Sequence, residues 1–274
     1  MPGFLLINPR SGKAGPTADE LAAAARERGV EPRILRAGED VAALAGAASQ
    51  GPLGVAGGDG SLARVAETAL GRDLPFVVVP YGTRNHFARD LGLDRNDPLA
   101  ALAAFDGEEQ RIDVGRADGR LFLNNVSFGV YASLVHRRER HRRRRIALAR
   151  ARALLRTVRH PHRLRLTVDG APIAARVILV ANNAYELRLF DLGERTSLRD
   201  GRLYLYSADG LLPTTWDERP GVSFTIAGAG ALRAALDGEP IELRPPVEFT
   251  IEPQALRVLL PPAVPSTEET PCRG

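Results

Sequence analysis

The rhythm of apolar residues changes near Ile112, and this change constrains the fold more than any other feature of the chain. Before it, short apolar runs alternate with helical patterns, as expected for a parallel sheet covered by helices on both faces. After it, short strand-like runs are often separated by Asp-Gly pairs, a pattern typical of antiparallel strands. We therefore expect an α/β domain over 1–112 and a mainly antiparallel β-sandwich domain over 113–262.

The expected elements follow from the same patterns. In the first part, strands are predicted over 4–7, 32–35, 53–56 and 76–79, and helices over 17–28, 41–48, 62–70 and 99–105. In the second part, strands are predicted over 121–126, 164–168, 173–181, 202–207, 222–226, 247–251 and 256–260. A long helix over 136–160 interrupts these strands, and the polar tail 263–274 is expected to be disordered.

Composition excludes several classes of protein. Apolar residues make up 44% and charged residues 26% of the 274 residues, which suits a globular chain. No apolar run approaches the roughly 20 residues that a membrane-spanning helix needs. The chain starts with a strand-like run and no basic leader, so a cytoplasmic location is the default expectation. The single cysteine, Cys272, excludes a disulfide framework and a cysteine-based metal site.

The sharpest motif is Gly57-Gly58-Asp59-Gly60-Ser61, which stands between a predicted strand and a predicted helix. Backbone N–H groups at such a helix start favour phosphate. The spacing formally fits a dinucleotide-binding fingerprint, but Asp59 would then place a carboxylate beside the pyrophosphate, and the strand over 76–79 lacks the acidic ribose partner. Asp59 is better explained as a Mg²⁺ ligand, directly or through water. For the isolated loop, a tight turn with Asp59 as a helix cap is about equally plausible.

Two further loops follow predicted strands. Asn8-Pro9-Arg10-Ser11-Gly12-Lys13 is not a Walker A loop, because Ile7 and Ala14 stand where glycine and a hydroxyl residue are required. Gly82-Thr83-Arg84-Asn85 follows the fourth strand and carries side chains suited to capping or phosphate contact. Because loops after parallel strands meet at one edge of a sheet, we expect all three loops to converge.

These three motifs, in this order and spacing, resemble the diacylglycerol kinase catalytic family. The likeness covers nearly the whole chain and continues through 125–129, Asn182-Asn183, 200–203 and Asp237-Gly238-Glu239. The resemblance implies a lipid kinase that uses ATP and Mg²⁺ to phosphorylate a hydroxyl group of a lipid such as diacylglycerol. It also implies that a nucleotide-binding α/β domain and a β-rich lipid-binding domain enclose the reaction.

The resemblance also assigns roles to residues. Asp237 matches the proposed general base of the family, with Glu239 beside it, and Asp59 is the third candidate catalytic group. From the residues alone, Asp237-Gly238 is better explained as a hairpin turn, as other Asp-Gly pairs in the chain are. The nucleotide site implied by the family consists of Asn8, Ser11, Gly12, Lys13, Gly57, Gly58, Asp59, Gly60, Ser61, Gly82, Thr83 and Asn85.

Two residues depart from the family pattern. His86 stands where the family commonly has an acid after the Gly-Thr-x-Asn motif, and Arg199 precedes Asp200 where an extra acid is usual. These departures keep open a catalytically impaired protein that binds lipid or nucleotide. A small-molecule kinase of the NAD kinase type, which shares the Gly-Gly-Asp-Gly loop, is the other alternative.

The basic excess, a net charge of +4, is concentrated in the arginine-rich segment 136–163. Arg145, Arg152, Arg156 and Arg159 fall near one helical meridian beside an apolar stripe, which suits peripheral contact with an anionic membrane. A solvated charged helix is the safer explanation for any charge run. A nucleic-acid partner is not expected, because no aromatics interleave with the arginines and no recognition motif is present. A homodimer is compatible with the sequence.

Overall fold

The computed structural model describes residues 1–12, 15–83, 85–129, 164–188, 191–209 and 216–262. Several predictions lie outside these residues and stay predictions. They are Lys13, the helix over 136–160 with Arg145, Arg152, Arg156 and Arg159, and the tail 263–274.

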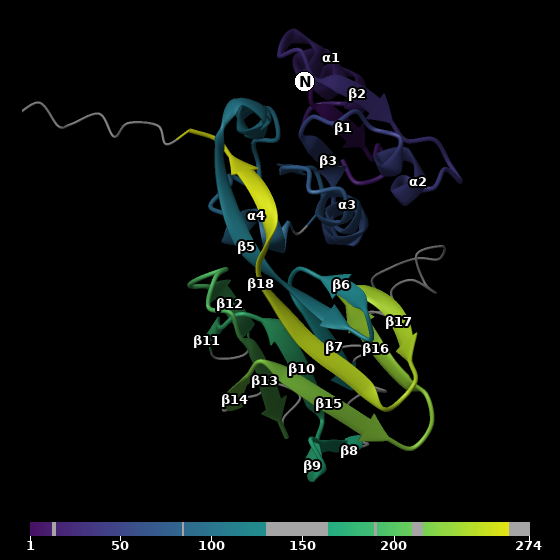
Figure 1. The fold of residues 1–274 in the computed structure, drawn as a ribbon, viewed down its shortest axis with the longest axis vertical. Coiled ribbons are helices and arrows are strands. Elements are labelled where there is room, and N and C mark those ends of the chain that lie inside the picture. Colours follow the sequence, from purple (N-terminus) through teal and green to yellow (C-terminus); the bar gives the residue numbers. More distant parts are fainter. Residues whose placement is uncertain (13–14, 84, 130–163, 189–190, 210–215, 263–274) are drawn as a thin grey trace, which may run out of the picture.

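The first half of the chain alternates strands and helices and forms the upper part of Figure 1. Its elements are β1 (Phe4–Ile7), α1 (Ala18–Glu27), β2 (Glu31–Ile34), α2 (Val41–Gly46), β3 (Leu53–Gly57), α3 (Asp59–Gly71), β4 (Phe76–Pro80), α4 (His86–Asp90) and the 3-10 helix η1 (Ala100–Asp106). The strands pair in parallel in the order β2-β1-β3-β4.

Both faces of this parallel sheet are buried, which explains why β1, β3 and β4 are apolar at nearly every position. Leu6, Val55 and Val78 point to one face and pack in a core with residues of α2 and α3. Leu5 and Val77 point to the other face and pack in a second core with residues of α1 and η1. The helices therefore cover the sheet from both sides, as predicted.

The second half consists of strands in the described residues and forms the lower part of Figure 1. Its strands are β5 (Glu108–Ala117), β6 (Arg120–Phe122), β7 (Asn125–Gly129), β8 (Leu164–Val168), β9 (Ala171–Ala175), β10 (Val177–Asn182), β11 (Tyr185–Arg188), β12 (Asp191–Arg195), β13 (Leu203–Ala208), β14 (Asp217–Gly221), β15 (Ser223–Gly228), β16 (Leu232–Leu236), β17 (Glu239–Leu243) and β18 (Val247–Leu260).

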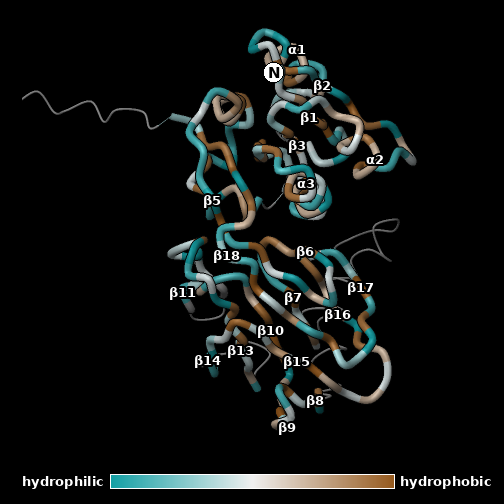
Figure 2. The backbone as a smooth tube through the Cα atoms, in the orientation of Figure 1, coloured by the Kyte–Doolittle hydropathy of each residue, from teal (hydrophilic) through white to brown (hydrophobic). Residues whose placement is uncertain are grey.

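Two of its sheets pack face to face around an apolar core. One is the six-stranded sheet β14-β13-β10-β7-β16-β17, and the other contains β18, β15, β8 and β9. Phe128 of the first sheet meets Phe249 of the second edge to face, with ring centroids 6.1 Å apart. In strands such as β15, exposed and buried residues alternate, and the hydropathy colours of Figure 2 alternate along the strands in the same way. The predicted fold class, an α/β part followed by a mainly antiparallel β part, is confirmed.

Strand β18 joins the two halves. Its start pairs antiparallel with β15 in the sandwich, and its end pairs in parallel with β4, with Val258 opposite Phe76. Along its length β18 also pairs with β5, with a register shift between Glu252 and Leu256. The first half's parallel sheet therefore continues through β18 into the sandwich. The domain boundary at residue 112 stays a prediction. Because β18 pairs with strands of both halves, removing β18 tests whether residues 1–112 fold independently.

Several predicted elements have different bounds in the structure. The segments 247–251 and 256–260, predicted as two strands, form the single strand β18, and the helix predicted over 99–105 is the 3-10 helix η1. The strand predicted over 173–181 divides at Arg176 into β9 and β10, because the chain changes sheets there. The strand predicted over 121–126 divides into β6 and β7. Sequence patterns missed α4, β5, β11, β12, β14, β16 and β17.

Candidate active site

The glycine motif makes the turn from β3 into α3. Gly58 is the N-cap of α3, and Asp59 is the first residue of the helix. Gly58 has no side chain that could cap the first turn, so the helix N-terminus is left for an acceptor from outside the motif. Thirteen residues of helix with aligned peptide dipoles favour an anion at this end.

The three predicted loops lie together at the carboxyl edge of the parallel sheet. Asn8 Nδ2 donates a hydrogen bond of 3.2 Å to Ser61 Oγ, which joins the first loop to the second. Gly58 and Gly82 pack backbone against backbone, because a Cβ on Gly82 would lie 2.6 Å from Gly58 Cα. Gly12 lies so close to the Tyr81 ring that a side chain there would overlap it. The predicted convergence of the loops is therefore present.

Asn85 holds the third loop in shape. It adopts a left-handed conformation with φ 49° and is buried. Its Oδ1 accepts from Gly82 N at 2.8 Å, and its Nδ2 donates to Gly82 O at 3.1 Å. These bonds engage its amide within the loop, whereas Thr83 is exposed. His86 is the first residue of α4.

Asp237 occupies the turn between β16 and β17, with φ 47°, followed by Gly238 at φ 83°. Its buried carboxylate accepts three backbone hydrogen bonds, from Leu123 N at 2.8 Å, Asn124 N at 2.7 Å and Asn125 N at 3.1 Å. These N–H groups lie at the break between β6 and β7, where the predicted strand 121–126 divides. At this break they donate to the Asp237 carboxylate instead of to a neighbouring strand. Asp237 is both a turn residue and a buried carboxylate.

The surroundings of Asp237 change its affinity for a proton. Burial is the largest effect and raises the pKa of Asp237 to about 6, although the three N–H groups act in the opposite direction. The negative charge of Asp59 also raises the pKa of Asp237. The two carboxylates therefore interact, although one belongs to the first half and the other to the second. A carboxyl group with a pKa of about 6 can accept a proton near neutral pH.

Glu239 brings the second half against the glycine motif. A Cβ on Gly60 would overlap the Glu239 carboxylate, so the side chain of Glu239 lies directly over the first turn of α3. The structure therefore gathers Asp59, Gly60, Asp237 and Glu239, which the sequence places in separate halves. This gathering is the candidate active site.

A Mg²⁺ ion at this site would need ligands besides the protein side chains. The described residues contain no group of three or more His, Cys, Asp or Glu side chains that could hold a metal ion by themselves. Mg²⁺ usually binds through one or two carboxylates together with substrate phosphates and water. Asp59, which accepts a long hydrogen bond of 3.4 Å from Phe87 N, is the carboxylate placed to contribute at the start of α3.

Arg199, the second residue that departs from the family pattern, lies beside a cluster of hydrogen-bonded motifs. Arg199 donates a hydrogen bond to Gln110 Oε1. Asp200 N donates to Asn183 Oδ1 at 3.0 Å, and Gly201 N donates to Asp113 Oδ2 at 2.7 Å. Asn183 and Asp113 are buried, so the Asn182-Asn183 and Asp200-Gly201 motifs meet in one hydrogen-bonded cluster.

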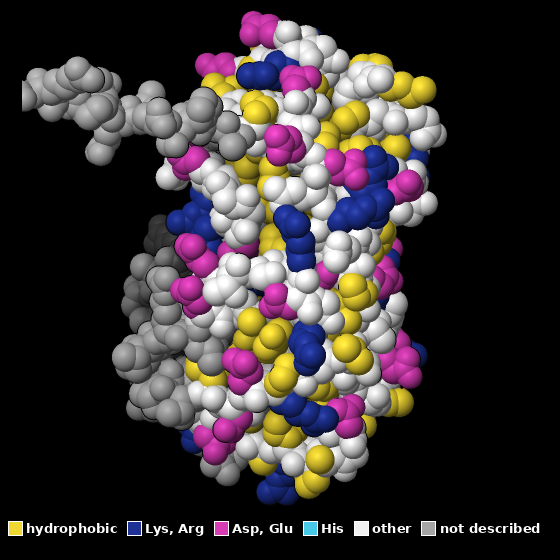
Figure 3. All heavy atoms as spheres, turned by 60° about the vertical axis from the view of Figure 1, so that its left-hand side comes forward, with side chains coloured by type: hydrophobic (Ala, Val, Ile, Leu, Met, Phe, Trp, Pro, Cys, Tyr) yellow, Lys and Arg dark blue, Asp and Glu magenta, His cyan; other side chains and the backbone are white. Residues whose placement is uncertain are grey.

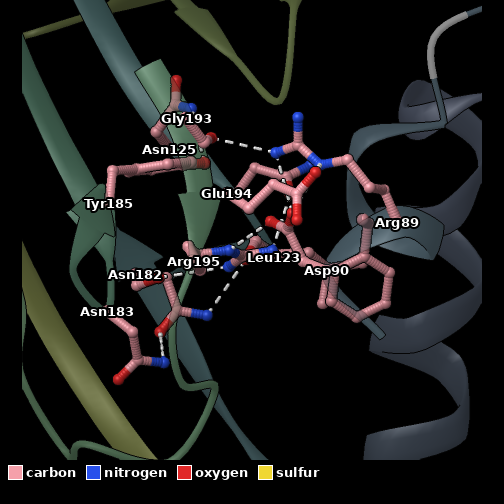
Figure 4. Close-up of polar contacts among 12 residues, drawn as sticks. Arg89, Asp90, Leu123, Asn125, Asn182, Asn183, Tyr185, Gly193, Glu194 and Arg195 are labelled. Carbon is pink, nitrogen blue, oxygen red and sulfur yellow. Dashed lines mark hydrogen bonds and ion pairs between the residues drawn. The ribbon is translucent and has the colours of Figure 1, made fainter. Parts of the chain in front are cut away.

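Sequence reasoning missed a buried ion pair that joins the two halves beside Asp237. It consists of Asp90 in α4 and Arg195 in β12, with Arg195 Nε 2.7 Å from Asp90 Oδ2, and both side chains are fully buried. Figure 4 shows Arg195, Leu123 and Asp90 close together, and Arg195 NH1 donates to Leu123 O at 2.6 Å. Neither residue lies in a motif, and a charge pattern along the chain does not indicate which arginine becomes buried.

Comparison with known proteins identifies relatives of this chain. A model of the diacylglycerol kinase catalytic domain matches residues 2–117. "Probable lipid kinase YegS-like" of Pseudomonas aeruginosa is 30% identical over 283 residues, covering 91% of this chain and 91% of that protein. "Diacylglycerol kinase" of Mycobacterium tuberculosis is 31% identical over 227 residues, covering 77% of this chain and 71% of that protein.

Solved structures show the same fold. A putative diacylglycerol kinase from Bacillus anthracis superposes with a TM-score of 0.70 at 19% identity, over 96% of this chain and 98% of that chain. A second diacylglycerol kinase structure from the same organism gives a TM-score of 0.67 at 16% identity. The fold, an α/β half followed by a β-sandwich half, matches that of these structures. The chain belongs to the diacylglycerol kinase catalytic domain family.

Proposed function

We propose that this protein transfers the γ-phosphoryl group of ATP to a hydroxyl group of a lipid such as diacylglycerol, with Mg²⁺. The observation that carries this proposal is the position of Asp237. A buried carboxylate with a raised pKa interacts with Asp59 of the glycine motif, where a nucleotide would place its phosphates. The names of the relatives from Pseudomonas aeruginosa and Mycobacterium tuberculosis support a lipid acceptor.

The proposed roles follow from geometry and charge. The glycine loops and the N-terminus of α3 bind the phosphates, since no side chain at the Gly58 N-cap occupies the start of this helix. Asp59 holds Mg²⁺, which neutralises phosphate charge when bound. Asp237 accepts the proton of the attacking hydroxyl group, and its three backbone hydrogen bonds fix the carboxylate in one orientation.

Phosphoryl transfer should be measured with γ-labelled ATP and Mg²⁺ against neutral and acidic lipids in mixed micelles. NAD and other soluble acceptors are included in the same panel. We expect a labelled lipid with the wild type and a loss of roughly two to four decades in rate with Asp237→Asn and with Asp59→Asn. A labelled soluble acceptor would indicate an NAD kinase-type reaction. Nucleotide binding without transfer to any acceptor would contradict the proposal.

Contact with a membrane surface is a separate proposal. No helix among the described residues is long and apolar enough to cross a membrane. On the face shown in Figure 3, acidic and basic side chains are interspersed over the described residues. We propose that the arginine-rich segment 136–163 supplies the attraction to anionic lipid. Cosedimentation with anionic vesicles should decrease when Arg145, Arg152, Arg156 and Arg159 are replaced together by Gln, and unchanged binding would contradict this proposal.

A further inference from the structure

Arg195 is a buried arginine that contacts both halves of the molecule. Its side chain is fully buried, and Nε donates to Asp90 Oδ2 at 2.7 Å. Asp90, also fully buried, accepts from Arg89 NH2 at 2.8 Å as well. A buried ion pair of this kind contributes little net stability, because removing two charges from water offsets their attraction. The role of this ion pair is therefore better judged from the groups that Arg195 contacts than from its contribution to stability.

The guanidinium of Arg195 binds the Leu123–Asn124 peptide group, and this peptide group binds the Asp237 carboxylate. Arg195 NH1 donates to Leu123 O at 2.6 Å, and NH2 donates to Asn124 Oδ1 at 2.9 Å. Leu123 O and Asn124 N belong to the same peptide group, and Asn124 N donates to Asp237 Oδ1 at 2.7 Å. A cation at the carbonyl end of a peptide polarises it and strengthens the hydrogen bond made by its N–H end.

On its other side, Arg195 contacts the helix that touches Asp59. The guanidinium lies over the Phe87 ring, 5.7 Å from its centroid. Phe87 N in turn donates to Asp59 Oδ1 at 3.4 Å. A continuous series of contacts therefore runs from Asp59 through α4 and Arg195 to the Leu123–Asn124 peptide and Asp237, and Figure 4 shows its central part.

We propose that Arg195 is a positioning residue, which fixes Asp237 relative to Asp59 by clamping α4 onto the Leu123–Asn124 peptide. The proposal rests on the proposed function, since it deepens the roles of those two carboxylates. A planar guanidinium is required because one group must reach Asp90, two carbonyl oxygens and an amide oxygen at once. A lysine in its place retains the charge opposite Asp90 but has no fork of donors.

The test compares Arg195→Lys with Arg116→Gln. Arg116 is a matched control, because it also connects the two halves through Glu67 of α3 and Glu252 of β18 but contacts neither Asp237 nor its peptide. We expect Arg195→Lys to lower kcat by about 10²-fold, as small misplacements of catalytic groups do. The KM for ATP should stay within about threefold of the wild-type value, because losing an interaction that acts in the transition state lowers kcat more than it changes KM. Arg116→Gln should leave kcat near the wild-type value.

A second measurement does not need kinase activity. Amide hydrogen exchange should show that Asn124 N–H is protected in the wild type, loses protection in Arg195→Lys and keeps it in Arg116→Gln. If Arg195→Lys does not fold, Asp90→Asn, which keeps the shape of the side chain, is measured with the same expectations. Wild-type protein without lipid kinase activity would contradict the proposed function, and the exchange data would still decide the role of Arg195.

Two outcomes would overturn the positioning role. One is a near-wild-type kcat together with unchanged Asn124 protection in Arg195→Lys. The other is an equal loss of kcat in Arg195→Lys and Arg116→Gln, which would show that any weakened contact between the halves lowers activity.

Discussion

Asp237 must lose its proton before it can accept one from a substrate, and its buried position opposes that loss. Because burial raises the pKa of Asp237 to about 6, kcat/KM should fall about tenfold per pH unit below this value. The measurement is kcat/KM for the lipid between pH 5 and 8 in mixed micelles. A rate that is flat over this range would exclude Asp237 as the base that titrates in the free enzyme.

The same pKa affects stability with the opposite sign. The folded pKa of about 6 lies above the ordinary value of 3.8, so the folded state binds the proton more tightly than the unfolded state. The resulting stabilisation is fully present below about pH 4 and is lost as pH rises through about 6; two pKa units correspond to about 3 kcal/mol. Denaturant unfolding at several pH values should show this decrease in the wild type and lack it in Asp237→Asn. Parallel curves for the two proteins would contradict it.

Three glycines near α3 should respond differently to alanine. In Gly60→Ala the three atoms nearest the new Cβ all belong to the exposed Glu239 side chain, which can move, so stability should change little while activity falls about 10²-fold. In Gly82→Ala the new Cβ meets the Gly58 backbone, so we expect a loss of about 1–3 kcal/mol in the free energy of unfolding. Thermal unfolding and kinase assays together distinguish these cases.

Gly71→Ala is the control for both substitutions. Gly71 ends α3, and a Cβ there meets nothing within 4 Å, so stability and activity should both be retained. Equal activity in Gly60→Ala and Gly71→Ala would show that the contact between Gly60 and Glu239 has no role in the reaction.

At the scale of an element, α1 tests how far local sequence signals determine structure. Thr17 caps α1, and its Oγ accepts from Glu20 N at 3.2 Å while Glu20 Oε2 accepts from Thr17 N at 2.7 Å. In the sequence, Thr17 and Glu20 stand three residues apart, which is the spacing of a capping box. Thr17→Ala should lower the free energy of unfolding by about 1 kcal/mol without changing KM for ATP, measured by denaturant titration. A larger loss accompanied by a change in KM would indicate that α1 supports the nucleotide loops.

At the scale of the whole molecule, β18 makes the first half dependent on the end of the chain. A fragment of residues 1–112 lacks β18, so β4 keeps only β3 as a neighbour and an apolar core loses Leu256 and Val258. We expect this fragment to unfold without cooperativity when followed by circular dichroism. Residues 1–117 joined by a flexible linker to 247–262 restore the pairing of β18 with β4 and β5 and should unfold more cooperatively. A cooperative transition in the shorter fragment would show that the boundary at residue 112 delimits an independent domain.

Local patterns in the sequence were sufficient for much of the first half. The apolar runs of β1, β3 and β4 and the capping signal of α1 depend on neighbours within a few residues, so they predicted these elements nearly to the residue. The loops after parallel strands were predicted to converge because parallel strands end at one edge. Asp59 was a candidate residue because it lies in a local motif, whereas Asp237 became one only through the resemblance to the family, since the residues alone favoured a hairpin turn there.

Tertiary structure decided which residues meet across the two halves. The sequence by itself determined most elements of the first half, the three loops after its strands and the turn at Asp237-Gly238. Only the fold decided that β18 is one strand, that the turn buries a carboxylate against Leu123–Asn125, and that Arg195 becomes the buried partner of Asp90. The physical reason is that capping and periodicity act between near neighbours, whereas burial of a charge depends on contacts more than 100 residues apart in the chain, such as Arg195 with Asp90 at a separation of 105.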